Sequence, residues 1–315
     1  MIDVYKDESF FVHRASKFRS QCCDFLLVCV CEEKISSNLP MPLTEREAEA
    51  ATSDGKTSVL TKAEYAAACE LIGRSFSGTA EQDPEWSLDW ILGPQLPREN
   101  VEVRTSLTEF YLSFAVAGNV RSGGAILAAK DADGKLQAVC ACRRMRHGKP
   151  SALWDAWIFG THLLSRLTKG KIPRYLTSNE HAPLRKSADK SINRRTKVFF
   201  KAMDQLHRQQ TSPHWYVAVM AVDPTAQGRG YGGQLMRAVS RMAAADGVRC
   251  YLEASGTRNK AFYEHLGYKT VDQRRLSVKE TVDLGWPDQE HFYALVRDVE
   301  TGVEPVPSQS RVLTD

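Results

Sequence analysis

A run of glycines between a predicted strand and a predicted helix constrains the fold of this chain most. The run is Gln227-Gly-Arg-Gly-Tyr-Gly-Gly233, and Val222-Asp-Pro224 comes shortly before it. Such a loop exposes successive backbone N–H groups at a helix N-terminus, where phosphate or pyrophosphate binds. Glycine suits the loop because a Cβ would block close approach and because some positions need positive φ. The loop alone predicts an anion site.

Hydrophobic periodicity predicts helices and strands on both sides of this run. The expected helices are 61–76, 107–116, 153–167, 195–209, 233–245 and 257–266. The expected strands are 125–130, 135–143, 214–222, 248–254, 268–275 and 291–297. Thr61 and Glu64 are expected to form a capping box at the start of the first helix. The turn Asp131-Ala-Asp-Gly134 joins the first two strands, which predicts an antiparallel hairpin and an α/β fold.

Changes in composition divide the chain. Residues 1–57 are interpreted as a poorly ordered extension and linker, since 36–57 is polar and interrupted by Pro40, Pro42 and Gly55. Residues 58–298 are expected to form one domain with a helical, basic insertion at about 144–200. The tail 299–315 is expected to be flexible.

Charge and cysteine content narrow the function classes. A net charge of +4 over 315 residues does not call for nucleic acid. The most apolar short stretch, 25–31, is far too short to cross a bilayer, so no membrane partner is expected. The eight cysteines contain no Cys-x-x-Cys pair, so neither a zinc site nor any other metal is predicted. A reducing, cytoplasmic location is the simplest expectation.

Three interpretations of the glycine run compete. A P-loop is excluded because no Lys-Ser/Thr follows the glycines. A nicotinamide dinucleotide fingerprint fits Gly228-x-Gly230-x-x-Gly233, with Glu253 about 20 residues further on. However, the dinucleotide turn leaves its strand directly into the first glycine, whereas here Asp223-Pro-Thr-Ala-Gln intervenes. The upstream strands also form a hairpin.

The third interpretation is a resemblance. Gln227-Gly-Arg-Gly-Tyr-Gly232 closely resembles the acetyl-CoA loop of the GNAT acetyltransferase superfamily, whose pattern is Gln/Arg-x-x-Gly-x-Gly/Ala. Tyr251-Leu-Glu-Ala-Ser255 and Asn259-Lys-Ala-Phe-Tyr-Glu-His-Leu-Gly-Tyr268 look like the next strand and helix of that family. The resemblance covers about 58–298, is strong over 214–270 and weak over 144–200. His214-Trp-Tyr before the loop is most similar to the puromycin-acetyltransferase-like branch.

The resemblance implies a mixed, mostly antiparallel sheet flanked by helices, with a splayed pair of strands that binds acetyl-CoA as co-substrate. The strand residues Met220, Ala221 and Val222 would pair with the pantetheine arm. Asn259 would also contact that arm, and the side chain of Arg229 could add positive charge at the phosphates. The pyrophosphate would be held by backbone N–H groups of the loop residues Gln227, Gly228, Arg229, Gly230, Tyr231, Gly232 and Gly233.

Amine attack on a thioester needs a neutral amine and a proton for the leaving thiolate. Tyr263 matches the family position that supplies this proton, although a plain core aromatic is the alternative. Glu253 is a candidate base, and pairing with Arg249 or Lys269 is an equally weighted alternative. His214 and Tyr216 share a strand face and are candidates to line the acceptor pocket. His207 is expected on a solvated helix face.

The function expected from this resemblance is an N-acetyltransferase that acts on a small-molecule or peptide amine in a ternary complex, as a monomer or homodimer. Two alternatives stay open. One is a non-catalytic acyl-CoA-binding regulatory module, and the other is a nicotinamide-dependent oxidoreductase. The basic residues between 166 and 201 are interpreted mainly as a solvated surface, with attraction for cofactor phosphates or an acidic acceptor as the alternative.

Overall fold

The computed structural model describes residues 43–78, 84–93, 96, 98–145, 160, 162–276 and 291–298. Seven strands form one sheet in the order β1-β2-β3-β4-β5-β7-β6. The strands are β1 (Thr57–Val59), β2 (Ala125–Lys130), β3 (Leu136–Met145), β4 (His214–Val222), β5 (Arg249–Ser255), β6 (Lys269–Arg275) and β7 (His291–Arg297). Every neighbouring pair is antiparallel except β4–β5. The predicted mixed, mostly antiparallel sheet is confirmed, and this order is not the doubly wound parallel sheet of a dinucleotide-binding domain.

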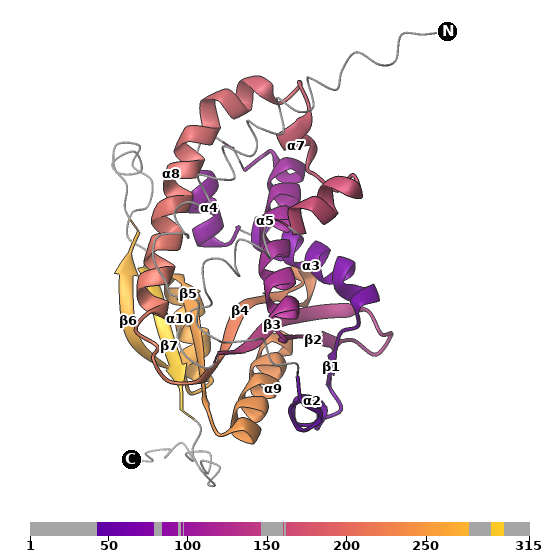
Figure 1. The fold of residues 1–315 in the computed structure, drawn as a ribbon, viewed down its shortest axis with the longest axis vertical. Coiled ribbons are helices and arrows are strands. Elements are labelled where there is room, and N and C mark those ends of the chain that lie inside the picture. Colours follow the sequence, from indigo (N-terminus) through magenta and orange to yellow (C-terminus); the bar gives the residue numbers. More distant parts are fainter. Residues whose placement is uncertain are drawn as a thin grey trace, which may run out of the picture.

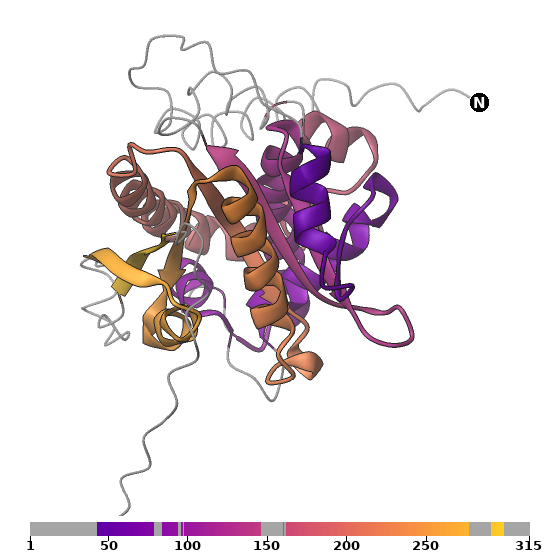
Figure 2. The ribbon, with the colours of Figure 1, turned by 90° about the horizontal axis from the view of Figure 1, so that it is seen from below.

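Helices cover both faces of the sheet (Figures 1 and 2). They are α2 (Glu45–Thr52), α3 (Tyr65–Ser77), α4 (Trp86–Leu92), α5 (Val101–Arg121), α7 (Arg174–Thr177), α8 (Ala182–His207), α9 (Tyr231–Asp246) and α10 (Gly256–His265), with short 3-10 turns at Lys62–Glu64 and Pro224–Ala226. Helix α9 packs on β2 to β5 on one face, with α2 beside it. Helices α3 and α5 pack on the opposite face, and α8 continues that layer over β6 and β7.

The central strands are buried on both sides. Along β3, Cys140 and Cys142 pack with α9, whereas Val139 and Ala141 pack with α3 and α5. Small side chains at these positions let helices approach both faces of the sheet closely. The predicted hairpin of β2 and β3 is confirmed by its antiparallel register.

The linker prediction for 36–57 is wrong over its second half. Thr44 and Glu47 form a complete capping box at the start of α2, and Ala51 is fully buried. Arg241 of α9 donates hydrogen bonds to the carbonyl oxygens of Ala50 and Ala51 at 2.8 and 2.9 Å. These contacts come from a helix about 190 positions away in the sequence. The polar composition of the segment therefore gave no sign that it is packed against the rest of the protein. Residues 1–42 lie outside the described residues.

Most other predicted elements are present with shifted ends. The capping box of Thr61 and Glu64 is confirmed, and α5 and α8 begin well before the predicted starts. Within the predicted helix 153–167, residues 153–159 and 161 lie outside the described residues, and 162–167 are helical. Among the described residues, no helix has the length and apolar composition that crossing a bilayer requires. That same part of the chain holds no cluster of three or more side chains suited to a metal.

Helix α4 is braced by buried charges. Asp89 pairs with the fully buried Arg104 at 2.6 Å and with the half-exposed Arg98 at 2.7 Å. Arg195 of α8, also fully buried, donates to the carbonyl oxygens of Ile91 and Leu92 at the end of α4. The last carbonyl groups of a helix have no partner within the helix and need donors from elsewhere. Arg195 supplies these donors from a buried position, so the prediction that the basic stretch is a solvated surface is wrong for this residue.

We expect Asp89→Asn to lower the free energy of unfolding by about 3–5 kcal/mol, because it leaves the buried Arg104 without a counter-charge. Urea unfolding followed by circular dichroism measures this change. Arg98→Met is the matched control, and it should cost less than about 1 kcal/mol because its guanidinium is half exposed. Equal costs for the two variants would contradict the assigned role of Arg104.

Candidate functional site

Strands β4 and β5 separate halfway along their length. Their parallel ladder runs from the pair His214–Arg249 to the pair Val217–Leu252, and both strands continue beyond it. In that continuation β4 pairs with β3 on its other side and β5 pairs with β7. The predicted splay around Met220 to Val222 is therefore present. It leaves two facing strand edges whose backbone groups are available to a ligand.

A bulge explains where the strands part. The register of β3 with β4 shifts between Ala141–Val219 and Cys142–Val217, which leaves Ala218 as the extra residue on β4. A bulge bends its strand and increases the local twist. The bend begins one residue after the last β4–β5 pair, so β4 turns away from β5 there.

The glycine run lies beside this opening. Gly228 has φ +77° and Gly230 has φ +85°, and Gly230 is the N-cap of α9. A Cβ at either glycine would meet no atom of the chain within 4 Å, so positive φ is what requires glycine there. At Gly232 the reason is close approach, since a Cβ would lie 3.2 Å from Cζ of Phe262. The first helical bond runs from the N–H of Gln234 to the oxygen of Gly230. The N–H groups of Tyr231, Gly232 and Gly233 therefore point out of the helix end.

Helix α3 fixes the start of the loop. Ser75 donates to the carbonyl oxygen of Val222 at 2.9 Å, and Arg74 pairs with Asp223 at 3.1 Å. Asp223 also accepts hydrogen bonds from the N–H and hydroxyl of Thr225. Burial works to raise the pKa of Asp223, but these hydrogen bonds and Arg74 outweigh it and lower the pKa. The carboxylate therefore stays charged and holds the turn into the loop.

A cavity of about 1000 Å³ joins the loop, the strand opening and the space under α4, α5 and α8. Most of the predicted site residues line it, namely Met220, Val222, Gln227, Gly228, Gly230, Tyr231, Gly232, Gly233, Asn259, Tyr263, Glu253 and Tyr216. Three others do not line it. The side chain of Ala221 packs under α3, Arg229 is exposed, and His214 is fully buried behind the cavity wall.

Tyr263 and Asn259 both face the cavity from α10. The Tyr263 ring packs edge-on against Phe262 and Tyr268. Burial, with smaller contributions from Cys140 and Glu85, raises the pKa of Tyr263 above its ordinary value. A phenol with a raised pKa stays protonated at neutral pH, as a proton donor must.

Glu253 is paired, but with a residue that sequence analysis had placed elsewhere. Its Oε1 lies 3.2 Å from Nδ1 of His207, and both side chains are almost completely buried. The prediction of a solvated His207 is wrong, because α8 turns this face onto the sheet between Tyr216 and Tyr251. Arg249, one of the two predicted alternative partners, pairs with Asp298 instead. A carboxylate beside an imidazole can accept a proton.

The two residues predicted for the acceptor pocket occupy different positions. Tyr216 lines the cavity, and burial raises its pKa well above the ordinary value. His214 donates from Nδ1 to the carbonyl oxygen of Ser212 at 2.8 Å. Burial lowers the pKa of His214 to about 4, so this ring is neutral at physiological pH.

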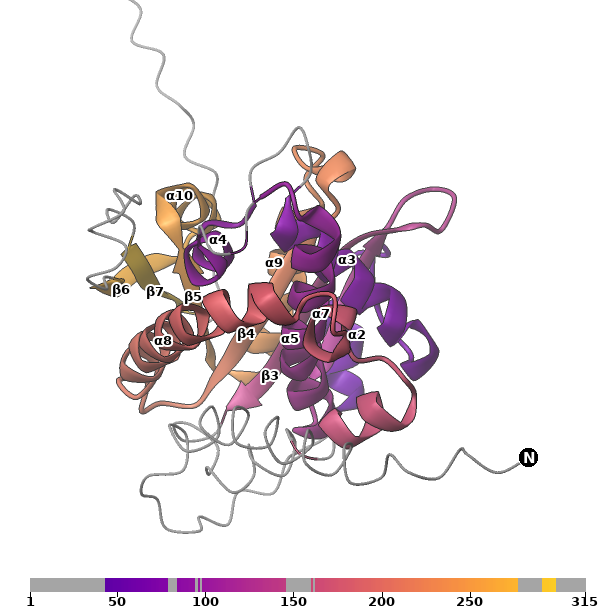
Figure 3. The same cartoon turned by 90° about the horizontal axis from the view of Figure 1, so that it is seen from above.

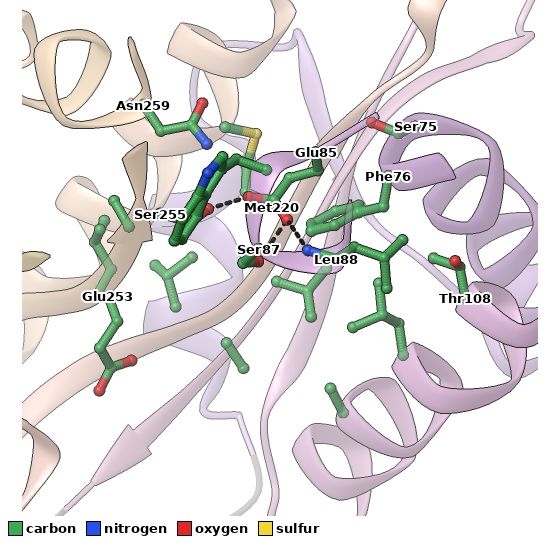
Figure 4. Close-up of a pocket in the computed structure, with 18 of the residues that line it drawn as sticks. Ser75, Phe76, Glu85, Ser87, Leu88, Thr108, Met220, Glu253, Ser255 and Asn259 are labelled. Carbon is green, nitrogen blue, oxygen red and sulfur yellow. Dashed lines mark hydrogen bonds between the residues drawn. The ribbon is translucent and has the colours of Figure 1, made fainter. Parts of the chain in front are cut away.

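Sequence analysis missed Glu85. This residue caps α4 and accepts a hydrogen bond from Ser255 at the end of β5 (Figure 4). Ser87 at 2.5 Å and the N–H of Leu88 at 3.0 Å also donate to its carboxylate. Glu85 and Ser255 lie 170 positions apart, so no local pattern could have linked them.

Part of the chain matches a known family. Residues 197–270, from the last turns of α8 to the start of β6, match the family described as acetyltransferase (GNAT) domain. An uncharacterized N-acetyltransferase of Schizosaccharomyces pombe is 30% identical over 61 residues, which are 19% of this chain and 25% of that protein. The match thus spans about a quarter of that relative's length.

Solved acetyltransferase structures align with this chain at low similarity. The Corynebacterium glutamicum protein described as histone acetyltransferase HPA2 and related acetyltransferase gives a TM-score of 0.41 at 18% identity, covering 80% of this chain and 98% of its own. Arylalkylamine N-acetyltransferase 2 of Aedes aegypti gives 0.43 at 13% identity, covering 78% and 99%. Likenesses this weak do not identify an acceptor.

Proposed function

We propose that this chain, a member of the GNAT superfamily, transfers the acetyl group of acetyl-CoA to a primary amine. One observation carries the proposal most directly: the glycine loop and the open edges of β4 and β5 face a single cavity. The loop suits a pyrophosphate, and the strand edges suit the amide groups of a pantetheine arm.

We assign the backbone N–H groups of Tyr231, Gly232 and Gly233 to the pyrophosphate, with Gln227 to Gly230 completing the loop. Met220 and Val222 line the opening where the arm would lie, and Asn259 faces it from α10. The backbone of Ala221 shares that edge, although its side chain is turned away. Arg229 is exposed at the loop and would add positive charge near the phosphates.

The proposed reaction is direct attack in a ternary complex. The amine nitrogen bonds to the thioester carbonyl carbon, and the carbon–sulfur bond then breaks. Tyr263 gives its proton to the departing sulfur, which leaves as the thiol. Glu253, oriented by His207, accepts the proton that the amine loses, and Tyr216 forms part of the acceptor wall. A backbone N–H near Val222 would stabilise the developing oxyanion.

The test is release of coenzyme A from acetyl-CoA in the presence of a broad panel of amines. We expect thiol release that depends on a primary amine, with the acetylated amine identified by mass spectrometry. Binding of acetyl-CoA without thiol release for any amine would instead indicate a regulatory module. Displacement of acetyl-CoA by NADH at comparable concentration would favour the dinucleotide interpretation.

A further inference from the structure

Glu85 places a carboxylate at the meeting point of α4, β5 and the cavity. Figure 4 shows its side chain between Ser255 of β5 and the first turn of α4, where Ser87 and Leu88 lie. The negative charge of Glu85 is one of the influences, after burial, that raise the pKa of Tyr263. Glu85 and Tyr263, the residue that we assign as proton donor, line the same cavity.

Among the described residues, the other two carboxylates of the cavity each lie beside a side chain that can carry a positive charge, whereas Glu85 does not. Glu253 faces His207 at 3.2 Å, and Asp204 pairs with Arg208 at 2.8 Å. Glu85 accepts hydrogen bonds from two hydroxyls and one backbone N–H, all of them neutral. No cation pairs with it among the residues that the structure describes. An anion at the wall of a largely apolar cavity favours a ligand that brings a positive charge.

The position of this carboxylate is fixed before any ligand binds. Arg195 holds the last turn of α4, and the buried pair of Asp89 and Arg104 holds its middle. The hydrogen bond from Ser255 then ties the first turn to the sheet. Such preorganisation lowers the cost of ordering a site when a ligand binds.

Beyond Glu85 the cavity wall is mainly apolar and aromatic. Residues of α4, α5 and α8 supply this wall, and Figure 3 shows where these three helices lie relative to the sheet. Their apolar contributions are Trp86, Leu88, Ile91, Leu92, Leu107, Tyr111, Leu112, Phe114, Ile192, Phe199, Phe200 and Met203. The same helices also contribute Thr108, Asn119, Asn193, Thr196 and Asp204 to the lining. Apolar side chains predominate, so an uncharged apolar body gains more from contact with this wall than a second ammonium or a peptide backbone does.

We propose that the Glu85–Ser255 pair binds the ammonium end of the acceptor, and that the acceptor is a primary amine attached to an uncharged, apolar body. This inference rests on the proposed acetyl transfer and defines its acceptor. Glu85 recognises the charged form of the amine, and the walls of α4, α5 and α8 hold the apolar body.

Three probes test the acceptor class with the full chain: 2-phenylethylamine, the diamine putrescine and the peptide Ala-Ala-Ala. We expect kcat/KM for 2-phenylethylamine to exceed kcat/KM for putrescine and for the peptide at least ~10-fold, since burial of the phenyl ring against the apolar wall stabilises the complex. In Glu85→Gln, KM for 2-phenylethylamine should rise at least ~10-fold, the usual effect of losing a hydrogen-bonded charge. Glutamine keeps an oxygen that can accept from the N–H of Leu88, so the cap of α4 is retained.

The neutral analogue 2-phenylethanol separates charge recognition from structural damage. Its inhibition constant should be the same for the wild type and Glu85→Gln, because it carries no charge. Glu47→Gln is the matched control, since Glu47 is another helix-capping carboxylate but belongs to α2, and its KM should stay at the wild-type value.

An unchanged KM in Glu85→Gln would overturn the inference, as would preference for putrescine or the peptide, or an equal loss of 2-phenylethanol inhibition. If the wild type binds acetyl-CoA but acetylates no amine at all, the proposed function itself fails. The two failures are therefore distinguishable.

Discussion

Gly230→Val should weaken acetyl-CoA binding at least ~100-fold, a loss of about 2.7 kcal/mol. Gly230 has φ +85° as the N-cap of α9, and a β-branched side chain strongly disfavours that backbone conformation. Since a Cβ there meets no atom of the chain, valine acts by moving the backbone rather than by a clash inside the protein. The N–H groups of Tyr231 to Gly233 would then no longer converge on the pyrophosphate. Isothermal titration with acetyl-CoA measures the effect.

Gly134→Val is the matched control for this variant. Gly134 has φ +78° in the turn between β2 and β3, also with open space around it. It does not line the cavity, so valine should strain the backbone there without changing acetyl-CoA affinity. Near-normal affinity in Gly230→Val would mean that the diphosphate binds elsewhere.

Tyr263→Phe should lower kcat at least ~10-fold, because general acid catalysis typically contributes 100-fold or more. The dissociation constant for acetyl-CoA should change little, since phenylalanine keeps the ring contacts with Phe262 and Tyr268. Steady-state kinetics and titration of each variant measure the two quantities separately. An unchanged kcat would remove Tyr263 from the mechanism.

Tyr268→Phe is the control for loss of a buried phenol. The ring of Tyr268 lies 5.8 Å from that of Tyr263, but Tyr268 does not line the cavity, so kcat of this variant should stay near the wild-type value.

The pH dependence of kcat is a second test of the role of Tyr263. Burial raises the pKa of Tyr263 above the ordinary value of a tyrosine, about 10, so its protonated, active form persists at alkaline pH. Deprotonation of Tyr263 should therefore cause no fall in kcat below about pH 10.

Short sequence patterns predicted much of the region that we assign to acetyl-CoA. The positive φ of Gly228 and Gly230, the capping box of Thr61 and the β2–β3 hairpin all depend on residues within a few positions of one another. A turn or cap uses hydrogen bonds within one short window, so its residue types reveal it. The same holds for Asn259 and Tyr263, which are one helical turn apart and both face the cavity.

Other predictions failed because the positions of the residues depend on contacts between parts of the chain that are far apart in the sequence. His207 was expected in solvent, yet it lies against Glu253, 46 positions away. Residues 44–57 were predicted to be a linker, yet Arg241 of α9 donates hydrogen bonds to the carbonyl oxygens of Ala50 and Ala51 in this segment. In each case the polar side chain or segment is buried because a distant element satisfies its hydrogen bonds.

The sequence by itself determined the glycine loop, the order of most helices and strands and the family resemblance, because each is a matter of spacing along the chain. Only the tertiary structure decided that Glu85 meets Ser255 across 170 positions and that Arg195 braces α4. The physical reason is that a charge or carboxylate acquires its role from the groups that surround it after folding. Those groups come from helices and strands that the sequence separates widely.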